Sequence, residues 1–86
     1  MNGPAIELPM YRCHKIVWAL KIKSIERDAV TILTFEDPRY AARQVSYAYD
    51  EKHKPEPGGY FVVYEDGYES FSPAKAFEEG YTLVQS

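Results

Sequence analysis

The stretch of sequence that decides the fold is GGYFVVYEDGYESFSPAKAFEEGYTLV, residues 58–84. Its run of β-branched and aromatic residues from Tyr60 to Tyr64 predicts a strand, and the preceding Gly-Gly pair lets the chain bend into it. Asp66-Gly67 then predicts a hairpin turn, because glycine tolerates the positive φ that such a turn demands. A second strand follows as far as Phe71.

The register of this hairpin depends on the length of its loop. A two-residue loop pairs Val62 with Phe71. A three-residue loop with a bulge at its glycine pairs Phe61 with Phe71 and Tyr64 with Tyr68. The sequence leaves both registers open.

A short helix and a closing strand are expected after the hairpin. Ser72 is expected to cap the helix, and Pro73 to occupy its first position, where a missing N–H costs nothing. Phe77 would face the core, and Gly80 would end the helix in the left-handed conformation. Residues 81–84 would form the last strand, at an edge of the sheet.

The chain upstream divides into an irregular arm, residues 1–10, and the start of a single domain that spans residues 11–86. The arm contains glycine and proline with little periodicity. From residue 11 to 25 apolar residues alternate with polar ones, which indicates a long strand with one solvent-exposed face that carries lysines. The apolar face carries Ile16, Trp18, Leu20 and Ile22.

Three further elements are expected between this strand and residue 58. Residues 29–35 form an antiparallel strand with apolar residues on both faces, and residues 43–45 form a brief third strand. Ser46 caps a short helix over residues 47–53. The sequence therefore predicts a single small α+β domain, with a mostly antiparallel, bent sheet of about five strands and two short helices.

The composition excludes several functional classes. A net charge of −3 argues against nucleic acid as a partner. One cysteine and two histidines are too few for a zinc site, and Cys13 and His14, as neighbours on a strand, point to opposite faces. No catalytic or phosphate-binding motif is found, so we expect no enzyme, no metal and no cofactor. No signal peptide or membrane span is expected either, and the lone cysteine favours the cytosol.

The first strand carries the candidate binding site. Arg12, His14 and Trp18 share one face at its start, where they would form an aromatic floor with a cationic rim for an anion or an acidic partner. The alternative is that Trp18 anchors the core. Eight tyrosines suit either a thin core or a binding face. The candidate binding residues are Arg12, His14, Lys15, Trp18, Tyr64 and Tyr68.

Two motifs, YRCHKIVWALKI at residues 11–22 and GGYFVVYEDGYESFSPA at residues 58–74, resemble a family of small proteins of unknown function from tailed bacteriophages and prophages. The resemblance covers nearly the whole chain after residue 10. It implies the bacterial host cytosol and brings no assigned activity. The order of elements over residues 60–84 is also similar to that of small phage sponge proteins, which sequester cyclic-nucleotide-like signals.

Three functional hypotheses follow. The leading one is a non-enzymatic, phage-type interaction module that engages a host or phage protein through its tyrosine-rich sheet. The first alternative is a binder of an anionic, nucleotide-like small molecule. The second is a structural homo-oligomer in which the edge strand at residues 81–84 pairs with its mate.

Overall fold

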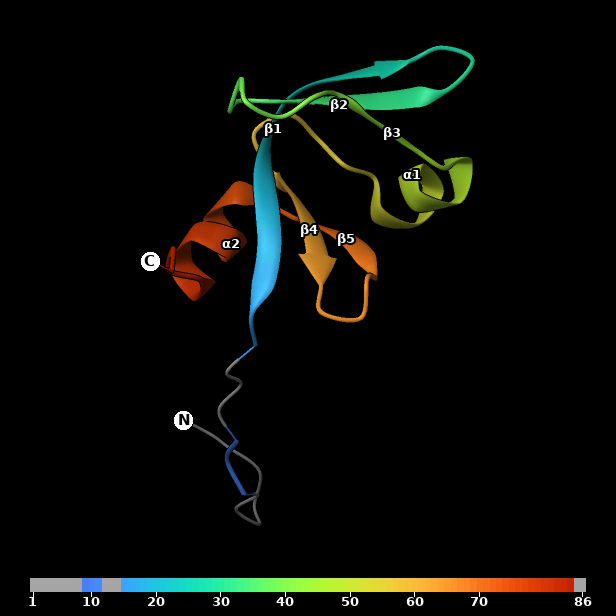
Figure 1. The fold of residues 1–86 in the computed structure, drawn as a ribbon. Coiled ribbons are helices and arrows are strands. Elements are labelled where there is room, and N and C mark those ends of the chain that lie inside the picture. Colours follow the sequence, from blue (N-terminus) through green and yellow to red (C-terminus); the bar gives the residue numbers. More distant parts are fainter. Residues whose placement is uncertain (1–8, 12–14, 85–86) are drawn as a thin grey trace.

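The structure is a computed structural model that describes residues 9–11 and 15–84. In chain order its elements are β1 (Val17–Arg27), β2 (Thr31–Phe35), β3 (Arg43–Val45), α1 (Tyr47–His53), β4 (Tyr60–Tyr64), β5 (Glu69–Ser72) and α2 (Ala74–Gly80). The strands form one antiparallel sheet in the order β3-β2-β1-β4-β5 (Figure 1). The expected α+β fold class is confirmed. The boundary between arm and domain stays a prediction, since residues 1–8 lie outside the described residues.

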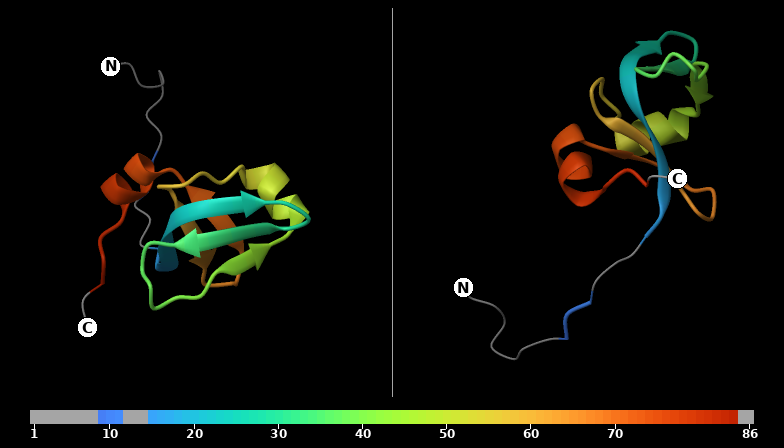
Figure 2. Two further views of the ribbon diagram at one scale, coloured as in Figure 1. Left: turned by 90° about the horizontal axis from the view of Figure 1, so that it is seen from above. Right: turned by 60° about the vertical axis from the view of Figure 1, so that its left-hand side comes forward.

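The long strand β1 holds the two halves of the sheet together. Its first half pairs with β4, from Val17 opposite Tyr64 onward, and its second half pairs with β2. The register shifts between Ile22 and Ser24, which marks a bulge where the strand changes partner. Figures 1 and 2 show the result, a sheet that curls around β1 into a half-barrel. A partly open, five-stranded antiparallel barrel is also the architecture of OB-folds.

The core lies inside this curl, where α1 closes it. Tyr49 is the buried residue of α1, and its ring contacts Phe61 at a centroid distance of 5.9 Å. Its hydroxyl donates to the Ser70 carbonyl at 2.6 Å, which satisfies the polar tip of a buried side chain. The buried cluster consists of Ile22, Leu33, Phe35, Val45, Tyr49 and Phe61.

The helix α1 and the β4–β5 hairpin form where the sequence predicts them. The Ser46 hydroxyl accepts from the Tyr49 N–H at 3.0 Å, so the predicted cap is confirmed. Phe61 pairs with Phe71, and the Tyr64 N–H donates to the Tyr68 carbonyl at 2.9 Å. The three-residue loop is therefore the correct register, with its glycine at a φ of 90°.

The expectations for the C-terminal segment are wrong in four respects. Ser72 lies in β5 and does not cap α2, whose N-cap position is Pro73. Gly80 is the last helical residue, and the extended backbone of Tyr81 ends the helix. Residues 81–84 form no strand and line a groove beside β1. Phe77 lies outside the core cluster and is half-buried between the rings of Tyr60 and Tyr81.

Candidate interaction surface

Three of the candidate residues meet beside the β4–β5 hairpin. The Lys15 ammonium lies 4.5 Å from the centroid of the Tyr64 ring, and the Tyr64 and Tyr68 rings stack at 5.7 Å. The Tyr68 hydroxyl lies 3.1 Å from Nε2 of His53 on α1. Burial, aided by the charge of Lys52, holds the pKa of His53 below its ordinary value. The imidazole is therefore neutral at pH 7. The contact between His53 and Tyr68 connects α1 to the hairpin.

Trp18 does not anchor the core. Its side chain is 59% exposed, although Leu20 and Ile22 on the same face of β1 pack in the core or against it. Along this face of β1, burial therefore begins with the half-buried Leu20 and is complete at Ile22. Arg12 and His14, which the sequence placed beside Trp18, lie outside the described residues.

Trp18 lines a groove of about 940 Å³ that we call the β1 groove. One wall is the first half of β1, and the other is formed by α2 and residues 81–84 (Figures 1 and 2). Its large apolar and aromatic side chains are Ile16, Trp18, Tyr60, Phe77, Tyr81 and Leu83. Trp18 and Leu83, the latter 80% exposed, make this an apolar surface that solvent reaches.

An aromatic stack forms the wall of the groove on the α2 side. Phe77 stacks on Tyr60 at a centroid distance of 4.1 Å and on Tyr81 at 4.6 Å. The Glu78 carboxylate accepts from the Tyr60 hydroxyl at 2.7 Å and from the Lys21 ammonium at 3.2 Å. These two hydrogen bonds hold the pKa of Glu78 below its ordinary value. The contacts fix α2 against β1 and β4.

The sequence analysis missed Tyr60, Phe77 and Tyr81 as members of this surface. Phe77 and Tyr81 are four residues apart, the spacing at which side chains meet on one helical face. That spacing could have indicated that the two side chains lie together. Their contact with Tyr60 depends on where α2 packs, which no local pattern contains.

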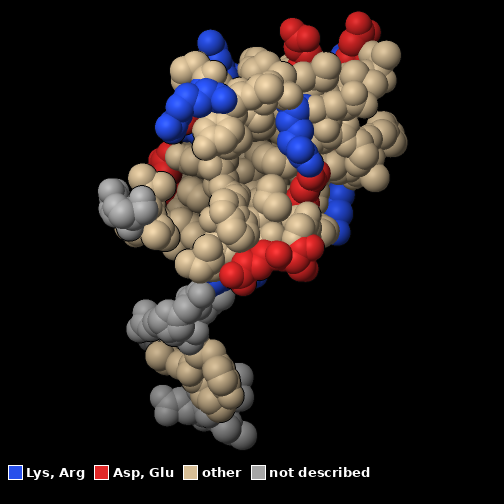
Figure 3. All heavy atoms as spheres, in the orientation of Figure 1, with Lys and Arg blue, Asp and Glu red and all other residues tan. Residues whose placement is uncertain are grey.

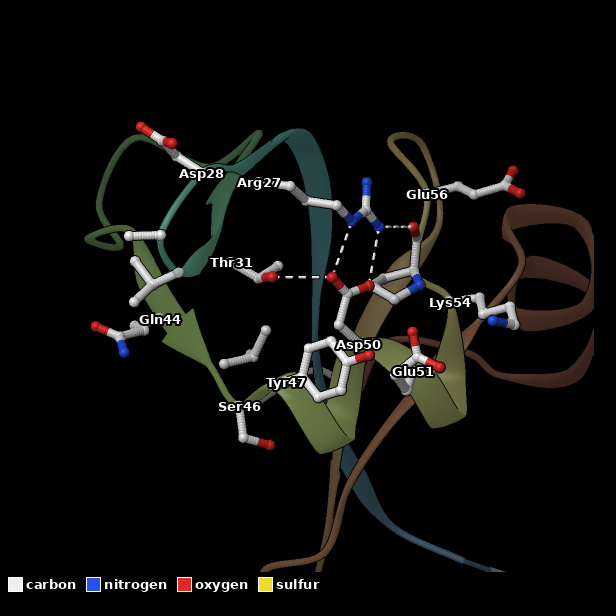
Figure 4. Close-up of a pocket in the computed structure, with 14 residues that line it drawn as sticks. Arg27, Asp28, Thr31, Gln44, Ser46, Tyr47, Asp50, Glu51, Lys54 and Glu56 are labelled. Atoms are coloured by element: carbon white, nitrogen blue, oxygen red, sulfur yellow. Dashed lines mark hydrogen bonds and ion pairs between the residues drawn. The ribbon is translucent and has the colours of Figure 1, made fainter.

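A second cavity, of about 730 Å³, lies between α1 and the β1–β2 turn (Figure 4). Arg27 donates to both oxygens of Asp50, at 2.9 and 3.1 Å, and also to the Pro55 carbonyl at 3.0 Å. Thr31 donates to the same carboxylate at 2.8 Å. The hydrogen bonds from Arg27 and Thr31 hold the pKa of Asp50 below its ordinary value. Because its central charges satisfy each other, we assign this cavity a structural role.

The described part of the chain contains neither a cluster of metal-binding side chains nor a helix that could span a membrane. Residues 9–11 and 15–84 contain no group of three or more His, Cys, Asp or Glu side chains that could hold a metal ion. The helices of the described chain, seven residues each, are too short to cross a membrane.

The β1 groove and the neighbouring tyrosine cluster therefore form a surface suited to contact with another macromolecule. No protein-family model matches this chain, and no curated protein matches it. A solved structure does match: the NMR solution structure of the monomeric form of the phage L decoration protein. The two are 34% identical with a TM-score of 0.61, and the match covers 79% of this chain and 52% of that one.

This chain thus spans about half the length of the protein that it matches. The match supports the phage association expected from the sequence motifs. The similarity in layout to phage sponge proteins stays a prediction. In both sequence and fold, this chain is similar to part of a phage decoration protein.

Proposed function

We propose that this protein is a non-enzymatic structural module of the decoration type, which binds the surface of an assembled phage capsid. The observation that carries the proposal is the match to the phage L decoration protein, in which sequence identity of 34% accompanies the shared fold. Because the match covers about half of that protein, the proposal concerns the capsid-binding module.

The surface of the molecule supports this reading. The face in Figure 3 has a broad uncharged area, with basic and acidic side chains to the right of its middle and along its upper and lower borders. Exposed large apolar residues such as Trp18 and Leu83 are typical of protein contact sites when they lie together, as they do in the β1 groove. The partner would be a phage protein, and the site of action would be the virion.

Co-sedimentation tests the proposal. The purified protein is mixed with heads assembled from the coat protein of the virus that encodes it, and the bound fraction is measured after pelleting. We expect saturable binding to assembled heads, with a fixed number of copies per head. Absence of saturable binding, with the protein folded by circular dichroism, would contradict the proposal.

The other two hypotheses stay predictions with separate tests. Binding of an anionic nucleotide would appear as thermal stabilisation by cyclic dinucleotides or ADP-ribose. A homo-oligomer would appear as concentration-dependent sedimentation. The edge strand on which the oligomer hypothesis relied is absent, because residues 81–84 form no strand.

A further inference from the structure

The first half of β1 has an open edge. One edge of β1 pairs with β4 from Val17 to Lys21. On the opposite edge, pairing with β2 begins only at Ile22. The Glu36 N–H, which donates to the Lys21 carbonyl at 2.9 Å, is the first backbone contact on that side. Among the described residues, no strand pairs with this edge before that point.

The hydrogen-bonding directions identify which groups the edge presents. Ile22 bonds toward β4, since its N–H donates to Gly59 and its carbonyl accepts from Gly58. In an antiparallel ladder the direction alternates along the strand, so Trp18 and Leu20 also point toward β4. Val17 and Ala19 therefore direct their N–H and carbonyl groups away from β4, and both residues line the β1 groove.

The side chains around this edge suit an inserted strand. Ile16, Trp18, Leu83 and Val84, of which 48%, 59%, 80% and 72% is exposed, all line the groove. Open strand edges in monomeric proteins are usually protected by charge, proline or a covering segment. Here the lysines flank the edge, whereas the groove beside it is apolar.

We propose that the β1 groove binds an extended segment of the capsid protein as an added strand of the sheet. The segment would carry apolar residues opposite Trp18 and a carboxylate opposite Lys15. This inference rests on the proposed function and names the surface that performs it. Strand addition supplies affinity through backbone hydrogen bonds and specificity through alternate side chains.

Charge selects this occupant over a second copy of the chain. A two-fold antiparallel pairing centred on Trp18 places Lys15 of one copy opposite Lys21 of the other. Centred on Ala19, it would need the edge as far as Lys23, which β2 already pairs from Ile22 onward. Like charges directly opposite each other destabilise a strand pair. Lys21 is balanced by Glu78 within the molecule, so Lys15 is the lysine beside the edge that lacks a carboxylate among the described residues. A second copy of residues 15–21 contains no Asp or Glu to offer it, whereas a capsid segment can place a carboxylate opposite Lys15.

The first test replaces Val17 by proline. Val17 is the first residue of β1, where proline is tolerated, and its N–H points away from β4. Val17→Pro therefore removes a donor needed by the added strand and leaves the β4 ladder intact. The matched control, Val17→Ala, keeps the donor. In the co-sedimentation assay we expect about tenfold weaker binding for Val17→Pro and less than about threefold for Val17→Ala.

Charge reversal and amide exchange provide independent readouts if the proline variant does not fold. Lys15→Glu is expected to weaken head binding, whereas Lys75→Glu, on the exposed side of α2 outside the groove, is expected to leave it unchanged. Hydrogen exchange of the wild-type protein should slow at Val17 and Ala19 when heads are bound.

The outcomes separate the two proposals. If wild-type protein binds heads while Lys15→Glu and Val17→Pro bind equally well and exchange at residues 17–20 is unchanged, the strand-addition site is wrong and the decoration function stands. If wild-type protein does not bind heads, both fail. A dimer of the free protein that Val17→Pro abolishes would contradict the choice of a capsid segment over a second copy.

Discussion

Gly59, just before β4, lies where the backbone packs closely against β5. It is buried, and a Cβ atom at this position would overlap the Phe71 ring and lie 2.9 Å from the Ser72 carbonyl oxygen. The residue is therefore needed for close packing. Gly80, at the end of α2, has open space around its Cβ position.

Replacing these two glycines tests the difference. Gly59→Ala forces the aromatic ring and the β5 backbone to shift, and we expect it to lower the free energy of unfolding by about 1 to 3 kcal/mol. Gly80→Ala meets no atom and adds helix propensity, so we expect no loss and a gain of up to about 1 kcal/mol. Urea denaturation of both variants measures the effect, and equal midpoints would show that the steric reason is wrong.

The attachment of α1 depends on polar contacts at two of its residues. Its N-terminal half carries Asp50, which receives three hydrogen bonds from Arg27 and Thr31. Its C-terminal end carries His53, whose ring lies near those of Tyr49 and Tyr68. Because Asp50 and His53 both titrate, each makes the free energy of unfolding depend on pH.

Asp50 contributes stability that acid removes. Its pKa is lower in the folded protein than the ordinary 3.8, so the unfolded chain binds protons more readily at low pH. The contribution is present above pH 3.8 and is lost as the pH falls through the folded value. We expect the difference in free energy of unfolding between wild type and Asp50→Asn to be constant above about pH 5 and to shrink as the pH falls below about 4.

A double-mutant cycle with Arg27→Gln is the control for this effect. Arg27 is half exposed, which screens the ion pair, so we expect a coupling free energy of about 0.5 to 1 kcal/mol at neutral pH. A coupling of zero, or a difference that is constant with pH, would show that the ion pair does not hold α1.

His53 gives a second, separate pH dependence. Its pKa in the folded protein is below the ordinary 6.5, so protonation favours the unfolded chain. The free energy of unfolding should fall as the pH drops below about 6.5, and His53→Gln should remove this part of the decrease. NMR titration of the ring should give a midpoint below the ordinary value, and a midpoint above it would contradict the prediction.

At the scale of the whole molecule, the half-barrel separates a small closed core from an open apolar groove. Leu33 is fully buried in the core, whereas Leu83 is exposed in the β1 groove. Two identical residues therefore have different roles, one in stability and one in the proposed binding.

Alanine substitution of these two leucines separates stability from binding. Leu33→Ala leaves a cavity, and we expect it to cost about 2 to 5 kcal/mol of unfolding free energy. Leu83→Ala should change stability by less than about 0.5 kcal/mol and should weaken head binding. Thermal melts and the co-sedimentation assay measure the two quantities. A large loss of stability in Leu83→Ala would show that residues 81–84 belong to the core.

The sequence by itself determined the elements whose signals are local. The Ser46 cap, the strand at residues 60–64 and the turn at Asp66-Gly67 depend on backbone requirements within a few residues, so pattern and turn chemistry predict them. Alternation along β1 likewise predicted which face enters the core. It did not show where along the strand that burial ends.

Tertiary structure alone decided the features that depend on distant segments. The exposure of Trp18 follows from where the core ends along β1, and the hairpin register is set in the pairing of β4 with β5. The C-terminal residues 81–84 have a strand-like composition, but they pair with no described strand and instead line the β1 groove. The β1 groove exists because β1 changes partner at its bulge, which leaves one edge of its first half unpaired.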